Sequence, residues 1–181
     1  MEKAPLRLIQ FRLALAFIIP LVSVIQPVGV HPVVVVLIVL GVLSDIFDGV
    51  IARKLNVVTD KIRKLDSNVD VLFTIGVLAS AFLLRTRITD HIFEILTIVG
   101  LEAFTYLCYW LKFKKQPSNH SYLTKAFGVV LFVNFCLMIG WNNFFLLKAL
   151  MVISILSYID GFAILIKLKK WKPDNKSIFH L

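Results

Sequence analysis

Six long apolar runs restrict what this chain can fold into more than any other feature. They occupy residues 8–26, 33–53, 66–84, 92–111, 126–147 and 149–166. An α-helix needs about 20 residues to cross the hydrocarbon core of a bilayer, and a helix pairs its own backbone polar groups there. Hydrophobic residues make up 59% of the 181 residues, which excludes an ordinary soluble globule. The sequence therefore predicts an all-α integral membrane protein with six transmembrane helices, forming one domain over residues 1–181.

The basic residues indicate which side of the membrane each connection faces. Lys and Arg total 20, and the net charge is +9. Seventeen of these residues lie in the N-terminal segment with Arg12, residues 53–64, residues 112–125 and the tail from Lys167. Because basic residues are favoured on the cytoplasmic side, we expect both termini and the junction between the second and third helices to face the cytoplasm. These residues lie between apolar runs and are not interleaved with aromatic residues, which argues against a nucleic-acid partner.

Five aspartates fall within residues 44–70, although the whole chain has only 11 acidic residues, and four of them form two closely spaced pairs. At about 100° per residue, the acidic pair on the second helix shares an arc of about 140° with three further residues. That arc holds Asp45, Asp48, Gly49, Ala52 and Arg53. On the third helix, Asp66 and Asp70 are separated by about 40°. Two carboxylates on each of two consecutive helices are thus predicted to converge just beneath the cytoplasmic surface.

Such a cluster needs compensation, because one aspartate at the centre of a membrane helix costs about 2.5 to 3.5 kcal/mol. Carboxylate oxygens with no His or Cys nearby suit hard divalent cations such as Mg²⁺ or Mn²⁺. Gly49 and Ala52 leave room for a ligand, and Arg53 offers a guanidinium fork for a diphosphate. Together these residues indicate a metal-assisted displacement at phosphorus, in which a carboxylate accepts the proton of an attacking hydroxyl and a nucleotide monophosphate leaves.

The stretch SDIFDGVIARKLNVVTDKIRKLDSNVD resembles the signature of the CDP-alcohol phosphatidyltransferases. The family pattern is D-x-x-D-G-x-x-A-R, then eight or nine residues, then G-x-x-x-D-x-x-x-D, and the chain matches seven of its eight defined positions. The resemblance implies an enzyme of phospholipid biosynthesis. Such an enzyme transfers a phosphatidyl or related phosphoalcohol group from a CDP-activated donor, such as CDP-diacylglycerol, to a hydroxyl acceptor and releases CMP. The resemblance also implies six helices, a homodimer and a lipid donor that enters from the bilayer.

The same resemblance implies roles for individual residues. Two divalent cations, Mg²⁺ or Mn²⁺, would be held by Asp45, Asp48, Asp66 and Asp70, and Asp70 would also be the general base. The CDP moiety would be lined by Gly49, Ala52 and Arg53. One position departs from the pattern, because Ile62 stands where the family has glycine. This branched side chain either reshapes the nucleotide pocket, as a feature of a less characterised branch, or makes the chain a catalytically silent member.

The sequence gives less information about the acceptor alcohol. The pair Asp66–Ser67 resembles the sequence at this point in serine-accepting members of the family. Candidates for acceptor binding are the basic and aromatic residues near the metal site and at the start of the fifth helix, namely Arg63, Lys64, Tyr122 and Lys125. The predicted topology places the active site toward the cytoplasm, in the cytoplasmic membrane of a bacterium or archaeon.

Two other interpretations account for the same four carboxylates. Acidic residues inside membrane helices often serve cation or proton transport, although the chain has no sign of the paired halves with broken helices found in many transporters. Alternatively, the aspartates only neutralise nearby Lys and Arg side chains at the membrane interface.

Overall fold

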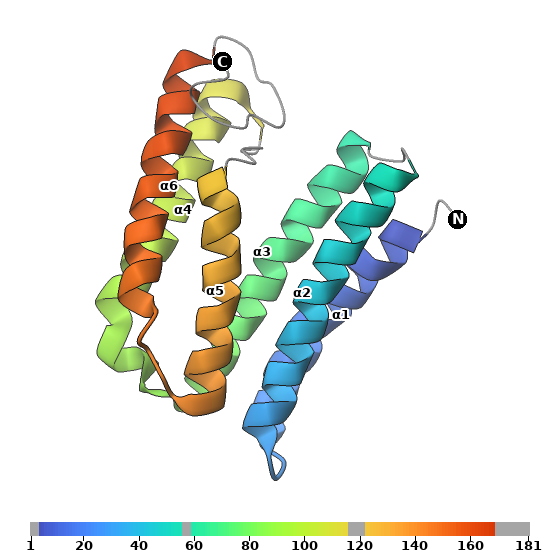
Figure 1. Cartoon of the computed structure of the whole chain (residues 1–181), viewed down its shortest axis with the longest axis vertical. Coiled ribbons are helices and arrows are strands. Elements are labelled where there is room, and N and C mark those ends of the chain that lie inside the picture. Colours follow the sequence, from blue (N-terminus) through green and yellow to red (C-terminus); the bar gives the residue numbers. More distant parts are fainter. Residues whose placement is uncertain (1–3, 56–58, 116–121, 169–181) are drawn as a thin grey trace. The chain divides into compact units, whose positions relative to one another are not determined.

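Within the residues that the structure describes, the chain forms six α-helices and one short 3₁₀ helix (Figure 1). This computed structural model describes residues 4–55, 59–115 and 122–168, and these ranges contain no β-strand. In chain order, the elements are α1 (Ala4–Ile25), α2 (Val30–Lys54), α3 (Asp60–Leu83), η1 (Arg87–His91), α4 (Ile92–Phe113), α5 (Tyr122–Trp141) and α6 (Leu147–Lys167). The all-α prediction is therefore confirmed.

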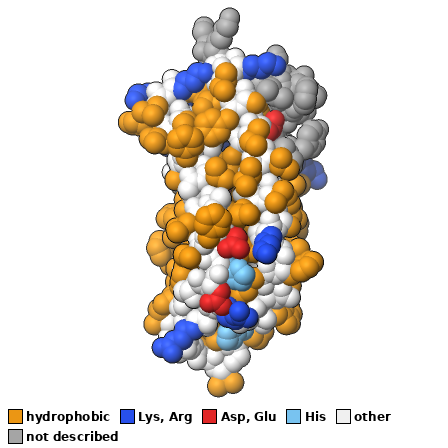
Figure 2. Space-filling view, turned by 90° about the vertical axis from the view of Figure 1, so that its left-hand side faces the viewer, with side chains coloured by type: hydrophobic (Ala, Val, Ile, Leu, Met, Phe, Trp, Pro, Cys, Tyr) orange, Lys and Arg blue, Asp and Glu red, His pale blue; other side chains and the backbone are white. Residues whose placement is uncertain are grey.

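Five helical segments are long and apolar enough to cross a membrane. They are Pro5–Ile25, Val30–Ala52, Lys61–Leu83, Arg87–Phe113 and Leu147–Lys167. In α5, the apolar stretch whose side chains are described, Ala126–Trp141, is shorter. Large hydrophobic side chains such as Phe17, Phe93 and Ile166 are exposed on the outside of the helices, and hydrophobic side chains cover much of the face in Figure 2. Six membrane spans with both termini in the cytoplasm stay a prediction.

Helix α3 begins six residues before the apolar run that predicted it. Thr59 has the extended backbone of an N-cap residue (φ −112°, ψ 158°), and its side chain accepts a hydrogen bond from the backbone N–H of Ile62 at 3.3 Å. This cap satisfies one of the free N–H groups at the helix start. The polar segment after Thr59 is therefore helical, which places Asp66 and Asp70 inside α3 and not at its first turn.

Helix α5 ends at Trp141, earlier than the predicted residue 147. Asn142 has a positive φ of 51°, in the left-handed region that asparagine tolerates better than most residues. Its side-chain oxygen accepts a hydrogen bond from the backbone N–H of Arg87 at 2.9 Å. The chain direction therefore changes at Asn142, inside a segment that hydrophobicity alone assigns to one continuous helix.

The chain divides into two compact units, and one domain over residues 1–181 stays a prediction. The first unit comprises Met1–Thr89 and Phe135–Asn143. In it, α1 packs against both α2 and α3. Glycines permit the close approaches: a Cβ on Gly76 would lie 2.3 Å from the backbone oxygen of Ala16 in α1, and one on Gly41 would lie 2.3 Å from the ring of Phe73. Close packing of small residues is what drives association of membrane helices.

The second unit comprises Asp90–Asn134 and Phe144–Leu181. Its main helix contact is between α4 and α6. A buried cluster of Ile98, Leu147 and Leu150 is covered by side chains that include Phe127 and Phe144. Polar contacts join the same two helices farther along, because Tyr158 of α6 donates a hydrogen bond to Glu102 of α4.

Candidate active site

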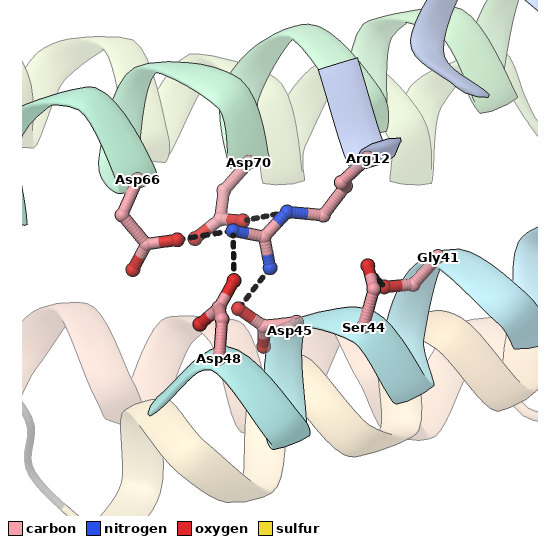
Figure 3. A network of polar contacts seen from close by, with 7 residues as sticks. All are labelled: Arg12, Gly41, Ser44, Asp45, Asp48, Asp66 and Asp70. Atoms are coloured by element: carbon pink, nitrogen blue, oxygen red, sulfur yellow. Dashed lines mark hydrogen bonds and ion pairs between the residues drawn. The ribbon is translucent and has the colours of Figure 1, made fainter. Parts of the chain in front are cut away.

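The four aspartates predicted to converge lie around one side chain, Arg12 of α1 (Figure 3). Its Nη1 pairs with Asp45 and its Nη2 with Asp66. Nη2 also lies 3.3 Å from Asp48 Oδ2, and Nε lies 3.2 Å from Asp70 Oδ1. All three nitrogens of the guanidinium therefore face carboxylates, and the cluster belongs to three helices of the first unit.

The local structure of α2 explains why its two acids point the same way. Asp45 and Asp48 are three residues apart, so they lie on one helix face. Ser44 directly precedes Asp45, and its hydroxyl donates to the backbone oxygen of Gly41, about one turn earlier, at 2.7 Å, which satisfies this buried polar group within its own helix. The absence of a side chain at Gly41 admits the Phe73 ring of α3 next to it. The acidic face of α2 is thus held beside α3.

Burial differs across the cluster. The Arg12 side chain is 1% exposed and that of Asp48 is 4% exposed, whereas Asp45, Asp66 and Asp70 are 42%, 32% and 47% exposed. The cluster therefore has a buried floor, made by Arg12 and Asp48, and an accessible rim of three carboxylates. Three of the four carboxylates are therefore accessible, whereas Arg12 and Asp48 are shielded.

The residues of the predicted nucleotide site lie on the same part of α2. Ala52 is buried and Gly49 is half-buried. Arg53 follows in α2, but its side chain lies outside the described residues. Ile62, which replaces the family glycine, is half-buried in the first turn of α3, one turn before Asp66.

The four candidate acceptor residues are only partly described. Arg63 is half-buried and Lys64 is exposed, and both lie in α3 within one turn of Asp66. Tyr122 and Lys125 belong to the first turn of α5, but their side chains lie outside the described residues. Arg63 and Lys64 are therefore close to Asp66 along α3.

Arg12 is the residue that the sequence analysis missed, because it was counted with the basic residues that set topology. The structure corrects this assignment, since Arg12 is buried among carboxylates. A signal was present: Arg12 stands alone inside the apolar run of residues 8–26. A charged residue in such a run needs a partner of opposite charge, and the largest acidic group in the sequence is the cluster on α2 and α3.

The donor atoms fit a divalent cation. One carboxylate oxygen from each of Asp45, Asp48 and Asp66 lies within 4.8 Å of the others. Mg²⁺ and Ca²⁺ bind oxygen ligands at about 2.0 to 2.6 Å, so one ion can reach oxygens this close together. A set made only of carboxylate oxygens favours Mg²⁺ or Mn²⁺ over softer metals.

The comparisons with known proteins agree with this arrangement of acids on apolar helices. No curated protein and no solved structure matches the chain at a significant level. The family model described as CDP-alcohol phosphatidyltransferase matches residues 4–159, a range that contains all four aspartates and Arg12. The members of this family are membrane enzymes that transfer a phosphoalcohol group from a CDP-alcohol, typically with divalent metal ions. The chain belongs to the CDP-alcohol phosphatidyltransferase family.

Proposed function

We propose that the chain is a metal-dependent enzyme that transfers a phosphatidyl or related phosphoalcohol group from a CDP-activated donor, such as CDP-diacylglycerol, to a hydroxyl acceptor. CMP is the leaving group. The observation that carries this proposal is the convergence of the four carboxylates of α2 and α3 on one point, with a buried floor and an accessible rim. Family membership supplies the class of donor.

In this proposal, divalent cations bound to Asp45, Asp48, Asp66 and Asp70 would polarise the donor diphosphate. Asp70 accepts the proton of the acceptor hydroxyl, which fits its place on the exposed rim. The hydroxyl oxygen then forms a bond to the phosphorus that carries the lipid group, and the bond from that phosphorus to the CMP oxygen breaks. Gly49 and Ala52, small residues on the same part of α2, leave room for the nucleotide.

The setting of the enzyme follows from the same expectations. We propose that it lies in the cytoplasmic membrane of a bacterium or archaeon, as a homodimer, with the active site toward the cytoplasm. The Lys and Arg side chains of residues 53–64, between the two pairs of aspartates, support this orientation. The lipid donor would reach the site from the bilayer, and the acceptor would be a small alcohol or an existing phospholipid.

A direct test is CMP release from CDP-diacylglycerol by the purified chain in detergent, with and without Mg²⁺. We expect Mg²⁺-dependent release that falls at least about 100-fold in Asp70→Asn, the lower end of the range for loss of a general base. Asp90→Asn is the matched control, because Asp90 is an exposed aspartate of η1 outside the cluster. Activity that is independent of metal, or that survives Asp70→Asn unchanged, contradicts the proposed mechanism.

The acceptor and the competing function need separate experiments. Glycerol phosphate, serine, inositol phosphate and a phospholipid should each be offered as the acceptor, and Ile62→Gly should be compared with the native chain. If CMP is never released and proteoliposomes that contain the chain show cation flux, the transporter interpretation replaces the enzyme.

A further inference from the structure

The buried guanidinium of Arg12 raises a question about the metal site that the proposed function leaves open. Its nitrogens pair with carboxylates from both α2 and α3, at the point where a cation would be bound. Asp45, Asp48 and Asp66, the residues whose oxygens lie within 4.8 Å of one another, are all among these partners. The guanidinium and a divalent cation therefore need the same ligands.

Electrostatics explains why a cation belongs at this position. Four carboxylates held this close repel one another, and removal of charge from water is costly unless an opposite charge is near. Arg12 is 1% exposed and supplies one positive charge to all four acids. Arginine suits this role because its planar group presents several N–H donors to several carboxylates at once.

A divalent cation changes this balance. It brings twice the charge of Arg12, and it coordinates carboxylate oxygens more closely than an N–H donor approaches them. The two cations also repel each other if the guanidinium stays among the same oxygens. Occupation of the site by metal is therefore favoured when the guanidinium withdraws from at least some of its four partners.

We propose that Arg12 is the resident counter-ion of the metal-free site, and that divalent cations compete with its guanidinium for the aspartates of α2 and α3. This inference rests on the proposed function only in requiring that the cluster binds metal. Arg12 then has two effects. It stabilises the metal-free protein, and it weakens the affinity of that protein for divalent cations.

The test measures binding of Mn²⁺ alone to the purified full chain in detergent, from the electron paramagnetic resonance signal of free Mn²⁺. Arg12→Met keeps a side chain of similar length without the charge, and we expect it to bind Mn²⁺ at least about 10-fold more tightly than the native chain. Arg7→Met is the matched control, because Arg7 is an exposed residue of the same helix outside the cluster. Its Mn²⁺ affinity should stay within about twofold of the native value.

Thermal unfolding without metal gives a second readout. Metal-free Arg12→Met should unfold at a lower temperature than the native chain, and saturating Mn²⁺ should raise its unfolding temperature more than that of the native chain. Arg12→Lys covers the case in which Arg12→Met does not fold. A single ammonium pairs with fewer carboxylates, so this variant should bind Mn²⁺ a few-fold more tightly than the native chain.

Several results would overturn the inference. Equal or weaker Mn²⁺ binding by both Arg12 variants means that the guanidinium does not compete with metal. An equal gain in Arg7→Met means that the effect is only one of net charge. Failure of every variant to bind Mn²⁺ removes the competition altogether. The proposed function is judged separately, because CMP release with Mg²⁺ does not depend on how Arg12 affects Mn²⁺ affinity.

Discussion

Substitution of Gly76 by alanine tests whether the contact between α1 and α3 positions the site. A Cβ at residue 76 would lie 2.3 Å from the backbone oxygen of Ala16, whereas carbon and oxygen atoms in close helix contacts lie about 3.3 Å apart or more. The clashing atom belongs to the backbone, so no side-chain rotation relieves it. The two helices therefore have to separate locally by about 1 Å.

The consequence reaches Arg12 because Ala16 lies one helical turn after it in α1. Overpacking of this kind lowers the free energy of unfolding by about 1 to 3 kcal/mol. Alanine in place of glycine inside a helix raises it by about 0.5 to 1 kcal/mol. We expect a net loss of up to about 2.5 kcal/mol relative to the native chain, and of about 1 to 3 kcal/mol relative to a glycine-to-alanine substitution that meets no clash. Because α1 packs against both α2 and α3, a displacement of about 1 Å also shifts Asp66 and Asp70 of α3 relative to the acids of α2, and such a misplacement can lower the rate of CMP release as much as about 100-fold.

The assay is unfolding in mixed micelles of increasing SDS fraction, followed by circular dichroism, together with CMP release. Gly100→Ala is the matched control, because a Cβ at Gly100 in α4 meets nothing within 4 Å. This control should be unchanged or more stable by up to about 1 kcal/mol. The reasoning is refuted if Gly76→Ala is as stable as the control.

Three further substitutions test individual contacts in the same unfolding assay. Thr59→Ala removes the N-cap of α3 and should lower the free energy of unfolding by about 1 kcal/mol, whereas Thr59→Ser should retain most of it. Tyr158→Phe removes the hydroxyl that donates to Glu102 and should cost about 1 to 3 kcal/mol, and Glu102→Gln in the same background should recover part of the loss. Lys112→Met removes the ammonium that donates to the backbone oxygen of Leu165 at the end of α6, so faster amide hydrogen exchange should appear only in the last turn of α6.

The helices could be predicted from the sequence to a large extent because each apolar run is long. The positions of the helix ends could not, because single residues decide them. Thr59 starts α3 within a polar segment, and Asn142 ends α5 within an apolar one. Hydrophobicity records which residues avoid water, whereas capping and a positive φ depend on local backbone geometry that hydrophobicity does not contain.

The parts of the site that depend on helical periodicity could be predicted from the sequence. The part that depends on packing between helices could not. Helical spacing gives the shared face of Asp45 and Asp48, and also that of Asp66 and Asp70. That α1 packs against both α2 and α3 depends on contacts such as Gly76 with Ala16. The spacing of residues within α2 or α3 contains no information about α1. The sequence alone therefore grouped Arg12 with the basic residues that set membrane topology.

The excess of negative charge around Arg12 leads to a last prediction, in which loss of function accompanies a gain in stability. Four carboxylates share one guanidinium, so neutralisation of one acid relieves more repulsion than attraction. Asp45 is a suitable choice, because its side chain is 42% exposed and the amide of asparagine can be solvated there. We expect metal-free Asp45→Asn to unfold at a higher temperature than the native chain.

The same variant should bind Mn²⁺ at least about 10-fold more weakly, because it loses one charged ligand. Stability and metal affinity then move in opposite directions, as expected where a strained arrangement of charges is retained for function. Asp90→Asn, outside the cluster, should leave the Mn²⁺ affinity unchanged. If Asp45→Asn is less stable than the native chain without metal, the ion pair with Arg12 outweighs the repulsion among the acids. The salt bridges to Arg12 would then stabilise the cluster by more than the repulsion among its carboxylates destabilises it.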